Sequence, residues 1–360
     1  MLTLNGIGTA VPPHSITQAQ AAELARQFCA VGDDRTRVLP TLYRRAGIVT
    51  RRSVLLEGEE NPQRQSFFAA AEHADDGGPT TGERMQRYAS ESGLLGMEAS
   101  AKALQAAACD PSEITHLVTA SCSGFHAPGF DIALIKRLGL PADVARTHVG
   151  FMGCHGAINA LRVAQAYGTA DRCARILVCA VELCSLHLHY GWDPDKMVAN
   201  SLFADGAAAV VLRANQDETD GWRLSATRSV LFPDSEDAMT WKIGDHGFEM
   251  TLSPKVPDLI ETHLADWLRG WLGTHGLSFD QVATWAVHPG GPRILAAVEE
   301  ALGLDRAALT VSREVLSEFG NMSSPTILFI LDRLRQRQAP RPCVALGFGP
   351  GLVAEAALLM

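Results

Sequence analysis

Positive charge is in short supply in this sequence. Its 360 residues include 31 Lys and Arg against 40 Asp and Glu, a net charge of −9 with histidine neutral. A general nucleic-acid or anionic-membrane surface needs a basic stripe that releases counterions, so the composition argues against both partners. Any anionic ligand must be attracted by a local group of basic side chains.

Long apolar runs are missing as well. No stretch reaches the roughly 20 residues that span a bilayer, so we expect no transmembrane segment. The first residues, MLTLNGIGTAVPPHS, carry no Lys or Arg before a short apolar stretch that prolines interrupt. This pattern argues against a signal peptide, and we therefore expect a cytoplasmic protein.

The eight cysteines follow no metal-binding pattern. They are scattered, with no Cys-x-x-Cys pair and no His-x-x-x-His ending that would complete a zinc ligand set. We interpret them as reduced thiols of a cytoplasmic protein. His187 and His189 alternate as on a strand, but two histidines without a third ligand favour a structural placement over a metal site. No bound metal is expected.

What the sequence does contain is a duplication. Its length allows two ordinary domains or one large fold, and 47% hydrophobic with 20% charged residues is ordinary globular composition. Apolar runs lie at 114–124, 150–164 and 175–185 and again at 281–291, 317–331 and 342–350. A constant offset of 167 residues relates three pairs of positions, namely Ser121 and His288, Cys154 and Asn321, and Val178 and Ala345. The shared offset indicates an internal repeat.

Each half of the repeat has the pattern of a strand, a helix and a strand. The outer runs are β-branched and apolar, as in buried strands, and the middle run is a glycine turn followed by helical periodicity. Buried strands of this kind imply a sheet covered by helices on both faces. Two such halves, at 1–212 and 213–360, predict a five-layered α/β/α/β/α sandwich.

The repeat places Cys154 and Asn321 at equivalent turns before helices, with His288 at a strand end. A thiol at a helix N-terminus is stabilised as the thiolate by the dipole and by free backbone N–H groups. A nearby imidazole would add an ion pair. Cysteine forms thioesters that exchange with other thioesters at little cost in free energy. Asn321 cannot titrate, so with His288 it would donate hydrogen bonds to a carbonyl oxygen that gains negative charge.

Each of these residues also has an ordinary explanation. A cysteine at an apolar helix start is more often inert packing, and a histidine before Pro-Gly-Gly can simply end a strand. An asparagine after glycine is typical of a turn or a helix N-cap. Only their combination at positions related by the repeat favours a catalytic site.

Several motifs resemble those of type III polyketide synthases. They are FMGCHGAINALRVA around Cys154, SLFADGAAAVVL at 201–212, WAVHPGG around His288, GNMSSPT around Asn321 and ALGFGPGLVAE at 345–355. The resemblance extends from about residue 4 to the C-terminus, and the terminal Gly-Phe-Gly-Pro-Gly is especially characteristic. It implies a thiolase-like fold, a homodimer and no permanently bound cofactor.

The same resemblance implies an acyltransferase whose substrates are CoA thioesters. Cys154 would accept the acyl group of an acyl-CoA starter, while His288 and Asn321 would decarboxylate malonyl-CoA and hold the oxyanion. Phe203 would be the aromatic gatekeeper between the CoA tunnel and the substrate cavity, or else an ordinary core residue. Phe348 would belong to the scaffold that shapes the cavity.

Cavity positions depart from the plant chalcone synthase pattern. A small glycine of that pattern corresponds to Trp241, the second gatekeeper phenylalanine to Met250, and an interface methionine to Ala127. A pocket that gains a tryptophan at one wall and loses an aromatic ring at another has a different shape. We therefore do not expect the coumaroyl starter of the plant enzymes.

Two cysteines occupy further cavity positions. Cys122 and Ser123 stand in a Cys-Ser-Gly sequence where plant enzymes have Thr-Ser-Gly, and Cys184 replaces a cavity threonine. Cysteine at position 184 resembles the microbial enzymes that make alkylresorcinols, alkylpyrones or naphthalenes. Cys184 could be a second nucleophile, but nothing adjacent supplies a base, so a cavity-lining role is favoured.

The densest basic cluster is Arg44, Arg45, Arg51 and Arg52. The matching segments of the family lie near the CoA entrance, so these arginines are candidates for the CoA phosphates. A solvated charged face explains them equally well.

The sequence thus predicts a type III polyketide synthase that extends an acyl-CoA starter, which could be a fatty acyl group, with malonyl-CoA and releases a resorcinol or pyrone. Two alternatives stay open. One is a β-ketoacyl-acyl-carrier-protein synthase III-like enzyme that condenses once, and the other is a degenerate acyl-CoA-binding protein. The starter, the number of extensions and the mode of cyclisation depend on cavity shape, which the sequence does not give.

Overall fold

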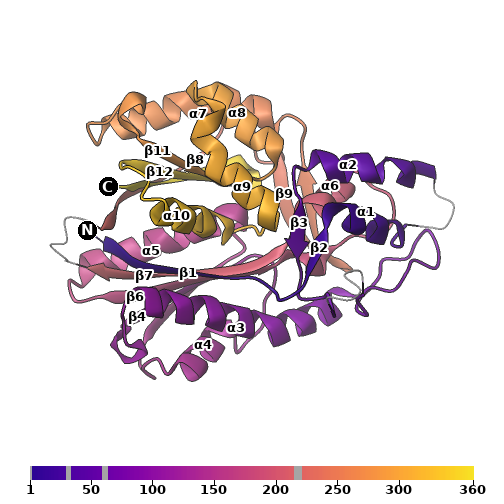
Figure 1. The fold of residues 1–360 in the computed structure, drawn as a ribbon, viewed down its shortest axis with the longest axis horizontal. Coiled ribbons are helices and arrows are strands. Elements are labelled where there is room, and N and C mark those ends of the chain that lie inside the picture. Colours follow the sequence, from indigo (N-terminus) through magenta and orange to yellow (C-terminus); the bar gives the residue numbers. More distant parts are fainter. Residues whose placement is uncertain (1, 30–33, 59–63, 215–220) are drawn as a thin grey trace.

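The described part of the chain comprises residues 2–29, 34–58, 64–214 and 221–360 of a computed structural model. Nine of its strands form one mixed sheet that occupies two levels (Figure 1). The sheet order is β11 (Thr284–Val287), β12 (Cys343–Gly349), β13 (Val353–Leu359), β8 (Trp222–Leu231), β1 (Leu2–Ala10), β7 (Asp205–Ala214), β6 (Arg175–Leu183), β4 (His116–Ser121) and β5 (Ala145–Gly150).

Helices cover both levels of the sheet and fill the space between them. In Figure 1, α7 (Val256–Gly273) and α8 (Pro292–Leu302) lie above the upper level, and α3 (Thr81–Ala106) and α4 (Phe130–Leu138) lie below the lower one. Between the levels lie α5 (Gly156–Ala170) and α10 (Thr326–Gln336), with α9 (Thr310–Phe319) leading into α10. The predicted five-layered arrangement is confirmed.

The two predicted repeats have matching topology. β4 pairs in parallel with β6, and β11 pairs in parallel with β12, with α5 and α10 in the respective crossovers. The pairing register differs by one residue, because Val118 lies opposite Val178 whereas Ala345 lies opposite Ala286. The offset is therefore not constant: with the last strands aligned at 167 residues the first strands are 168 apart, and α5 and α10 begin 170 residues apart.

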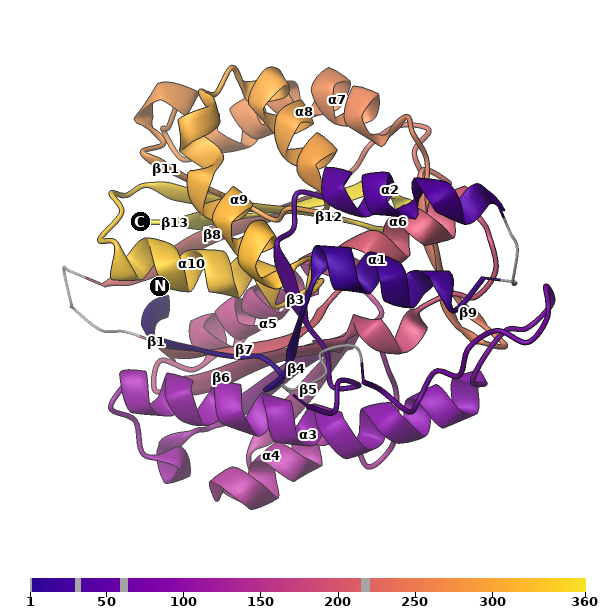
Figure 2. The same cartoon turned by 45° about the vertical axis from the view of Figure 1, so that its right-hand side comes forward.

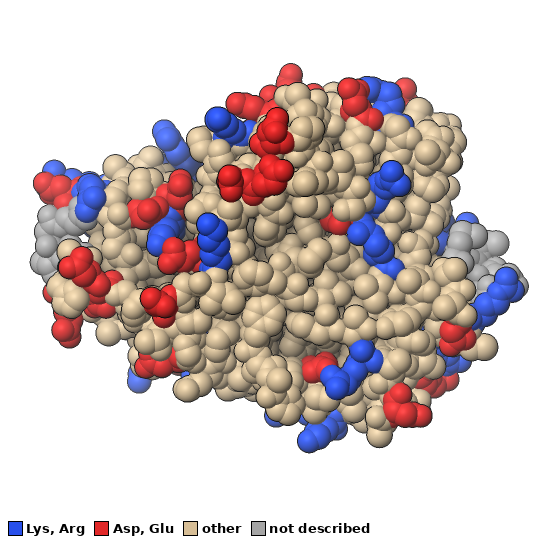
Figure 3. Space-filling view, turned by 180° about the vertical axis from the view of Figure 1, so that it is seen from behind, with Lys and Arg blue, Asp and Glu red and all other residues tan. Residues whose placement is uncertain are grey.

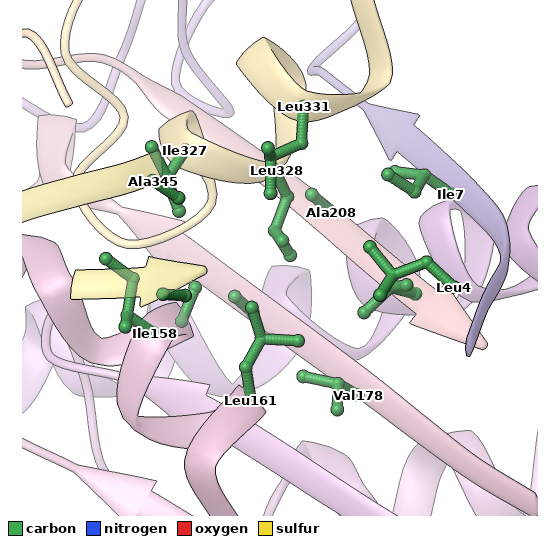
Figure 4. Packing of buried hydrophobic residues seen from close by; sticks show 14 of the residues in the cluster. Leu4, Ile7, Ile158, Leu161, Val178, Ala208, Ile327, Leu328, Leu331 and Ala345 are labelled. Carbon is green, nitrogen blue, oxygen red and sulfur yellow. The ribbon is translucent and has the colours of Figure 1, made fainter. Parts of the chain in front are cut away.

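The middle layer packs through apolar side chains, apart from Asn159 and Arg162 of α5, which bond to Glu355 of β13. Leu161 of α5 and Leu331 of α10 are fully buried, and they point into a cluster with residues of both sheet levels (Figure 4). Truncating such a leucine to alanine typically costs about 2–5 kcal/mol of stability. The turn before α5, which carries Cys154, and the turn before α10, which carries Asn321, are therefore held by a rigid core.

A smaller group of elements lies at one end of the layers, seen in Figure 2. It contains β2 (Ser15–Thr17), α1 (Gln18–Arg26), α2 (Leu39–Arg45), β3 (Thr50–Arg52), α6 (Pro194–Leu202) and the hairpin β9 (Met239–Gly244) with β10 (Gly247–Leu252). Thr17 and Gln20 form a capping box on α1, and Asp193 caps α6 by accepting from two backbone N–H groups. This group encloses the candidate cavity.

The boundary expected at residues 212 and 213 falls near the end of β7, and residues 215–220 of the polar connector lie outside the described residues.

Acidic and basic side chains are interspersed on the face shown in Figure 3, with uncharged surface between them. None of the helices in the described ranges is long and apolar enough to cross a membrane.

Candidate active site

Cys154 lies in a single 3-10 turn, Gly153–His155, directly before α5. Gly153 has φ +73°, and a Cβ there would lie 2.4 Å from the Cδ atom of Pro350. Only glycine tolerates both the left-handed backbone and this close approach. The predicted glycine turn before the helix is confirmed, and it places the thiol at the N-terminus of α5.

The surroundings of the Cys154 thiol act on its pKa in opposite directions. Burial raises its pKa to about 11, while hydrogen bonding to Ser323 lowers it, the charge of Glu182 raises it and hydrogen bonding to Asn321 lowers it. Desolvation of the thiolate thus outweighs the helix dipole and the hydrogen bonds. The predicted stabilisation of the thiolate by the helix start and a nearby imidazole stays a prediction.

Asn321 lies between α9 and α10 and is 2% exposed. Its Oδ1 accepts from the backbone N–H of Ser323 at 2.8 Å, and its Nδ2 donates to the carbonyl oxygen of Gly290 at 3.3 Å. The preceding Gly320 has φ +75°. Because the amide oxygen accepts from Ser323 and one N–H is donated to Gly290, the second N–H is the group that Asn321 offers to the Cys154 thiol or to a ligand.

His288 follows β11 directly and is 1% exposed. Its backbone N–H donates to the carbonyl oxygen of Leu346 at 2.8 Å, but both ring nitrogens are buried and have no hydrogen-bond partner in the described part of the chain. Burial, together with His155, lowers the pKa of the ring to about 3. This lowered pKa favours the neutral imidazole, and among the described residues no hydrogen bond selects the nitrogen that carries the proton.

The two halves of the chain meet at Phe203. The backbone of Phe203 forms a parallel bridge with Asn321. The N–H of Asn321 donates to the carbonyl oxygen of Leu202, and the N–H of Ala204 donates to the carbonyl oxygen of Asn321, both at 2.9 Å. The candidate gatekeeper Phe203 and the candidate oxyanion donor Asn321 thus lie on two adjacent backbone segments that hydrogen-bond to each other.

A narrow, mainly apolar cavity lies beside this bridge. Its wall includes four of the predicted cavity residues, Phe203, Cys184, Trp241 and Met250. It continues between α1 and the segment after β3, where the lining residues are Leu24, Phe28, Leu55, Leu56 and Phe68. Cys154, His288 and Asn321 are not part of this wall, so Phe203 and Cys184 stand at the end nearest to them.

The hairpin β9–β10 forms one side of the cavity. Trp241 lies opposite Met250 across the hairpin, and its ring centroid is 6.4 Å from that of Phe203. His187 and His189 fasten the hairpin: His187 accepts from the N–H of Phe248, and His189 contacts the carbonyl oxygen of Phe248. The structural interpretation of these two histidines is confirmed.

Cys122 and Ser123 differ in their orientation. The Cys122 sulfur lies 3.3 Å from the Ser323 hydroxyl oxygen, close to the candidate triad. The Ser123 hydroxyl instead donates to Glu182 and accepts from the N–H of Leu183. Ser123 therefore faces the scaffold, and its predicted place in the cavity wall is not found.

Phe348 is 2% exposed and packs in the cluster of the upper sheet level with α7 and α8. It therefore belongs to the scaffold, at a distance from the cavity lining.

The structure separates the four arginines. Arg44 is exposed and donates to Thr41, and Arg45 lines a groove that reaches Gly290 and Gly291 beside His288. Arg51 is buried and donates to two main-chain carbonyl oxygens. Arg52 donates to the carbonyl oxygens of Pro12 and Pro13. Only Arg44 and Arg45 keep guanidinium groups directed to solvent, so the predicted cluster is not one binding surface.

Two residues near the thiol were not predicted. Glu182 is fully buried and accepts from the backbone N–H groups of Cys122 and Ser123 and from the hydroxyl of Ser324. Ser323, with φ +56°, contacts both Cys122 and Cys154. A lone acidic residue within the apolar strand RILVCAVEL was the available signal for Glu182.

Within the described ranges, no group of three or more His, Cys, Asp or Glu side chains is arranged to hold a metal ion. The three candidate residues supply a thiol, an imidazole and a carboxamide.

Known proteins share both the sequence and the fold. Residues 1–216 match the N-terminal domain of chalcone and stilbene synthases, and residues 223–360 match their C-terminal domain. The chain is 38% identical to the 1,3,6,8-tetrahydroxynaphthalene synthase of Streptomyces peucetius subsp. caesius, covering 98% of this chain and 91% of that protein. It is 31% identical to the alpha-pyrone synthesis polyketide synthase-like Pks18 of Mycobacterium tuberculosis, covering 99% and 90%.

Among solved structures, PKS-I from the brown alga Ectocarpus siliculosus has a TM-score of 0.93 at 30% identity, covering 99% of this chain and 97% of that chain. The type III polyketide synthase domain of Steely1 from Dictyostelium has a TM-score of 0.88 at 26% identity. The chain therefore belongs to the chalcone and stilbene synthase family: it is a type III polyketide synthase, an acyltransferase whose substrates are CoA thioesters.

Proposed function

We propose that Cys154, His288 and Asn321 are the catalytic residues of this enzyme and that it extends an acyl-CoA starter with malonyl-CoA units. The observation that carries the proposal is the meeting of two chain halves: the Cys154 thiol lies within hydrogen-bonding reach of Asn321, which is itself bonded to the loop after His288. We propose that neither half, 1–212 or 213–360, is active alone.

In the loading step, the neutral His288 ring takes the proton of the Cys154 thiol as sulfur attacks the starter thioester carbonyl. The carbon–sulfur bond to CoA breaks, and the proton passes to the departing CoA thiolate. Among the described residues the ring nitrogens of His288 have no hydrogen-bond partner, so a lone pair is free for this transfer.

In the extension step, the carbon–carboxylate bond of malonyl-CoA breaks and its electron pair forms an enolate. The N–H groups of Asn321 and His288 stabilise the enolate oxygen. The enolate carbon attacks the Cys154 thioester, and the sulfur leaves as the thiolate. His288 accepts a hydrogen bond in loading and donates one here, which suits a ring whose tautomer no neighbour fixes.

We propose that the apolar cavity beyond Phe203 takes the hydrocarbon part of the starter or of the growing chain. Its walls at α1, Leu55, Leu56 and Phe68 are mostly alkyl and phenyl groups, which favour an alkyl chain over a polar aromatic acid. This supports a fatty acyl starter and a resorcinol- or pyrone-type product.

We propose that CoA occupies the groove lined by Arg45, Gly290, Gly291 and Arg293. The glycines give a thioester a path to His288, and the arginines supply the local positive charge that an acidic protein needs for the phosphates.

We propose that the enzyme is a cytoplasmic homodimer that pairs at β5. This strand ends the sheet and is bonded on one side, to β4. Phe125 and Met152, each 39% exposed, lie in the loops after β4 and β5. An unpaired edge beside apolar side chains favours pairing with a second copy. Light scattering that gives the mass of one chain would contradict this.

Product mass spectrometry tests the function. The enzyme is incubated with carbon-13-labelled malonyl-CoA and starters of graded chain length. We expect products whose label content reports several extensions without a carrier protein. A single extension that stops would support the carrier-protein synthase alternative, and no turnover across the starters would support a degenerate binding protein.

A further inference from the structure

Arg51 is a buried charge without an ion-pair partner among the described residues. It is 9% exposed. Burial lowers its pKa, while Tyr43 and the nearby charge of Asp205 raise it. Its guanidinium carbon lies 5.5 Å from the centre of the Tyr43 ring. Since apolar side chains often replace buried charges with no loss of stability, the contacts of this guanidinium need another explanation.

Those contacts are with the end of α6. Nη1 of Arg51 donates to the carbonyl oxygens of Asn200 at 2.7 Å and Phe203 at 2.8 Å. Carbonyl groups at a helix C-terminus lack intrahelical partners and carry partial negative charge. The arginine thus fixes the backbone of Phe203 by a charge-assisted bond.

The stem of Arg51 packs against the segment that carries Asn321. A Cβ placed on Gly320 would lie 3.1 Å from Cγ of Arg51. The strand of Arg51 is itself fastened to the end of α9, since the N–H of Val49 donates to Ser317 at 2.7 Å and the Thr50 hydroxyl to Glu318 at 2.8 Å. The side chain of Arg51 therefore contacts both segments of the bridge, the one that carries Phe203 and the one that carries Asn321.

We propose that Arg51 is a positioning residue that holds the Phe203 gate and the Asn321 amide in register, and that it makes no contact with CoA phosphates. The inference rests on the proposed roles of Phe203 and Asn321. Displacing the bridge shifts the Asn321 amide relative to the enolate oxygen, and a misplacement of about 1 Å can cost on the order of 100-fold in rate.

The test compares Arg51→Met with the parent on two classes of thioester. One class is acyl- and malonyl-CoA, and the other is the corresponding N-acetylcysteamine thioesters, which lack the CoA phosphates. Acylation of Cys154 is followed by intact mass and decarboxylation by carbon dioxide release. Arg341→Met is the matched control, because Arg341 also donates Nη1 to main-chain carbonyl oxygens, of Gly221 and Met360, far from the triad.

We expect the decarboxylation kcat of Arg51→Met to fall about 10- to 100-fold with both classes, while KM for malonyl-CoA changes by less than about threefold. Arg51→Lys, which keeps the charge and a donor, should recover part of the rate. If Arg51→Met does not fold, Arg51→Lys is compared with the parent, and a smaller loss confined to the same step is expected.

A defect seen with CoA substrates alone would make Arg51 a phosphate contact and overturn the proposal. Unchanged kinetics in the variants would overturn it as well. So would an equal loss of loading and decarboxylation with a lower melting temperature and no recovery in Arg51→Lys, which is the signature of a structural role. A parent enzyme that is not acylated on Cys154 would overturn the proposed function itself.

Discussion

The indole Nε1–H of Trp241 donates to the main-chain carbonyl oxygen of Cys122 at 2.8 Å. The bond joins the β9–β10 hairpin to the loop after β4 and so fixes the cavity wall next to the candidate triad. The sequence resemblance aligns Trp241 with a glycine of the plant chalcone synthase pattern. An indole therefore fills space that a glycine leaves open, and a hydrogen bond holds it in place.

Trp241→Gly should widen the range of accepted starters and lengthen the products, because it removes an indole from the wall. Product mass spectrometry with a mixture of starters checks this. Trp241→Phe keeps a ring but loses the bond to Cys122, so it separates the effect of volume from that of fixation. An unchanged product profile in Trp241→Gly would remove Trp241 from the specificity wall.

Leu24→Trp should shorten the starters that the enzyme accepts. Leu24 lines the cavity end formed by α1, so a larger side chain there blocks long chains and leaves short ones untouched. We expect kcat/KM for dodecanoyl-CoA to fall on the order of 10- to 100-fold and that for hexanoyl-CoA to change by less than about threefold. Equal losses for both starters would mean that the alkyl chain lies elsewhere.

Cys154→Ala should acquire no acyl adduct from acyl-CoA, since the sulfur that forms the thioester is gone. Intact-mass measurement checks this. Cys184→Ala is the matched control and should load as the parent does, because Cys184 is assigned to the wall. If Cys154→Ala loads as readily as the parent, the nucleophile lies elsewhere, and loss of loading in Cys184→Ala would make that thiol the first candidate.

Asn321→Ala should load the starter but lose most malonyl decarboxylation. Removal of one oxyanion donor typically lowers the rate about 100- to 1,000-fold. The variant also loses the bonds to Ser323 and Gly290, each worth about 0.5–1.5 kcal/mol, so thermal unfolding is measured alongside. Undiminished carbon dioxide release from a folded variant would exclude Asn321 from this step.

Alkylation of Cys154 by iodoacetamide should accelerate with pH well into the alkaline range. The thiolate is the reactive form, and with the pKa raised to about 11 by burial its fraction grows about tenfold per pH unit below that value. A resting thiolate–imidazolium pair would instead give a rate that is already constant near neutral pH. Peptide mass spectrometry must locate the label, because Cys173 is exposed and reacts as well.

The sequence by itself determined the repeat and the kinds of chemistry available. Periodic apolar runs predict buried strands and helices wherever they occur. The sequence also shows a glycine in each of the two turns, Gly153 and Gly320, and both adopt positive φ. The three candidate catalytic residues follow from the repeat and the family motifs. These features are local, so short stretches of sequence carry them.

Only the tertiary structure decided how polar side chains are oriented and which groups are charged. Burial raises the pKa of the Cys154 thiol, and a helix start in the sequence does not reveal that. Arg51 faces inward and Arg45 outward although both belong to one basic cluster. Burial and hydrogen bonding depend on residues that are distant in sequence. These tertiary contacts affect the free energy of a charged or hydrogen-bonding group more strongly than its sequence neighbours do.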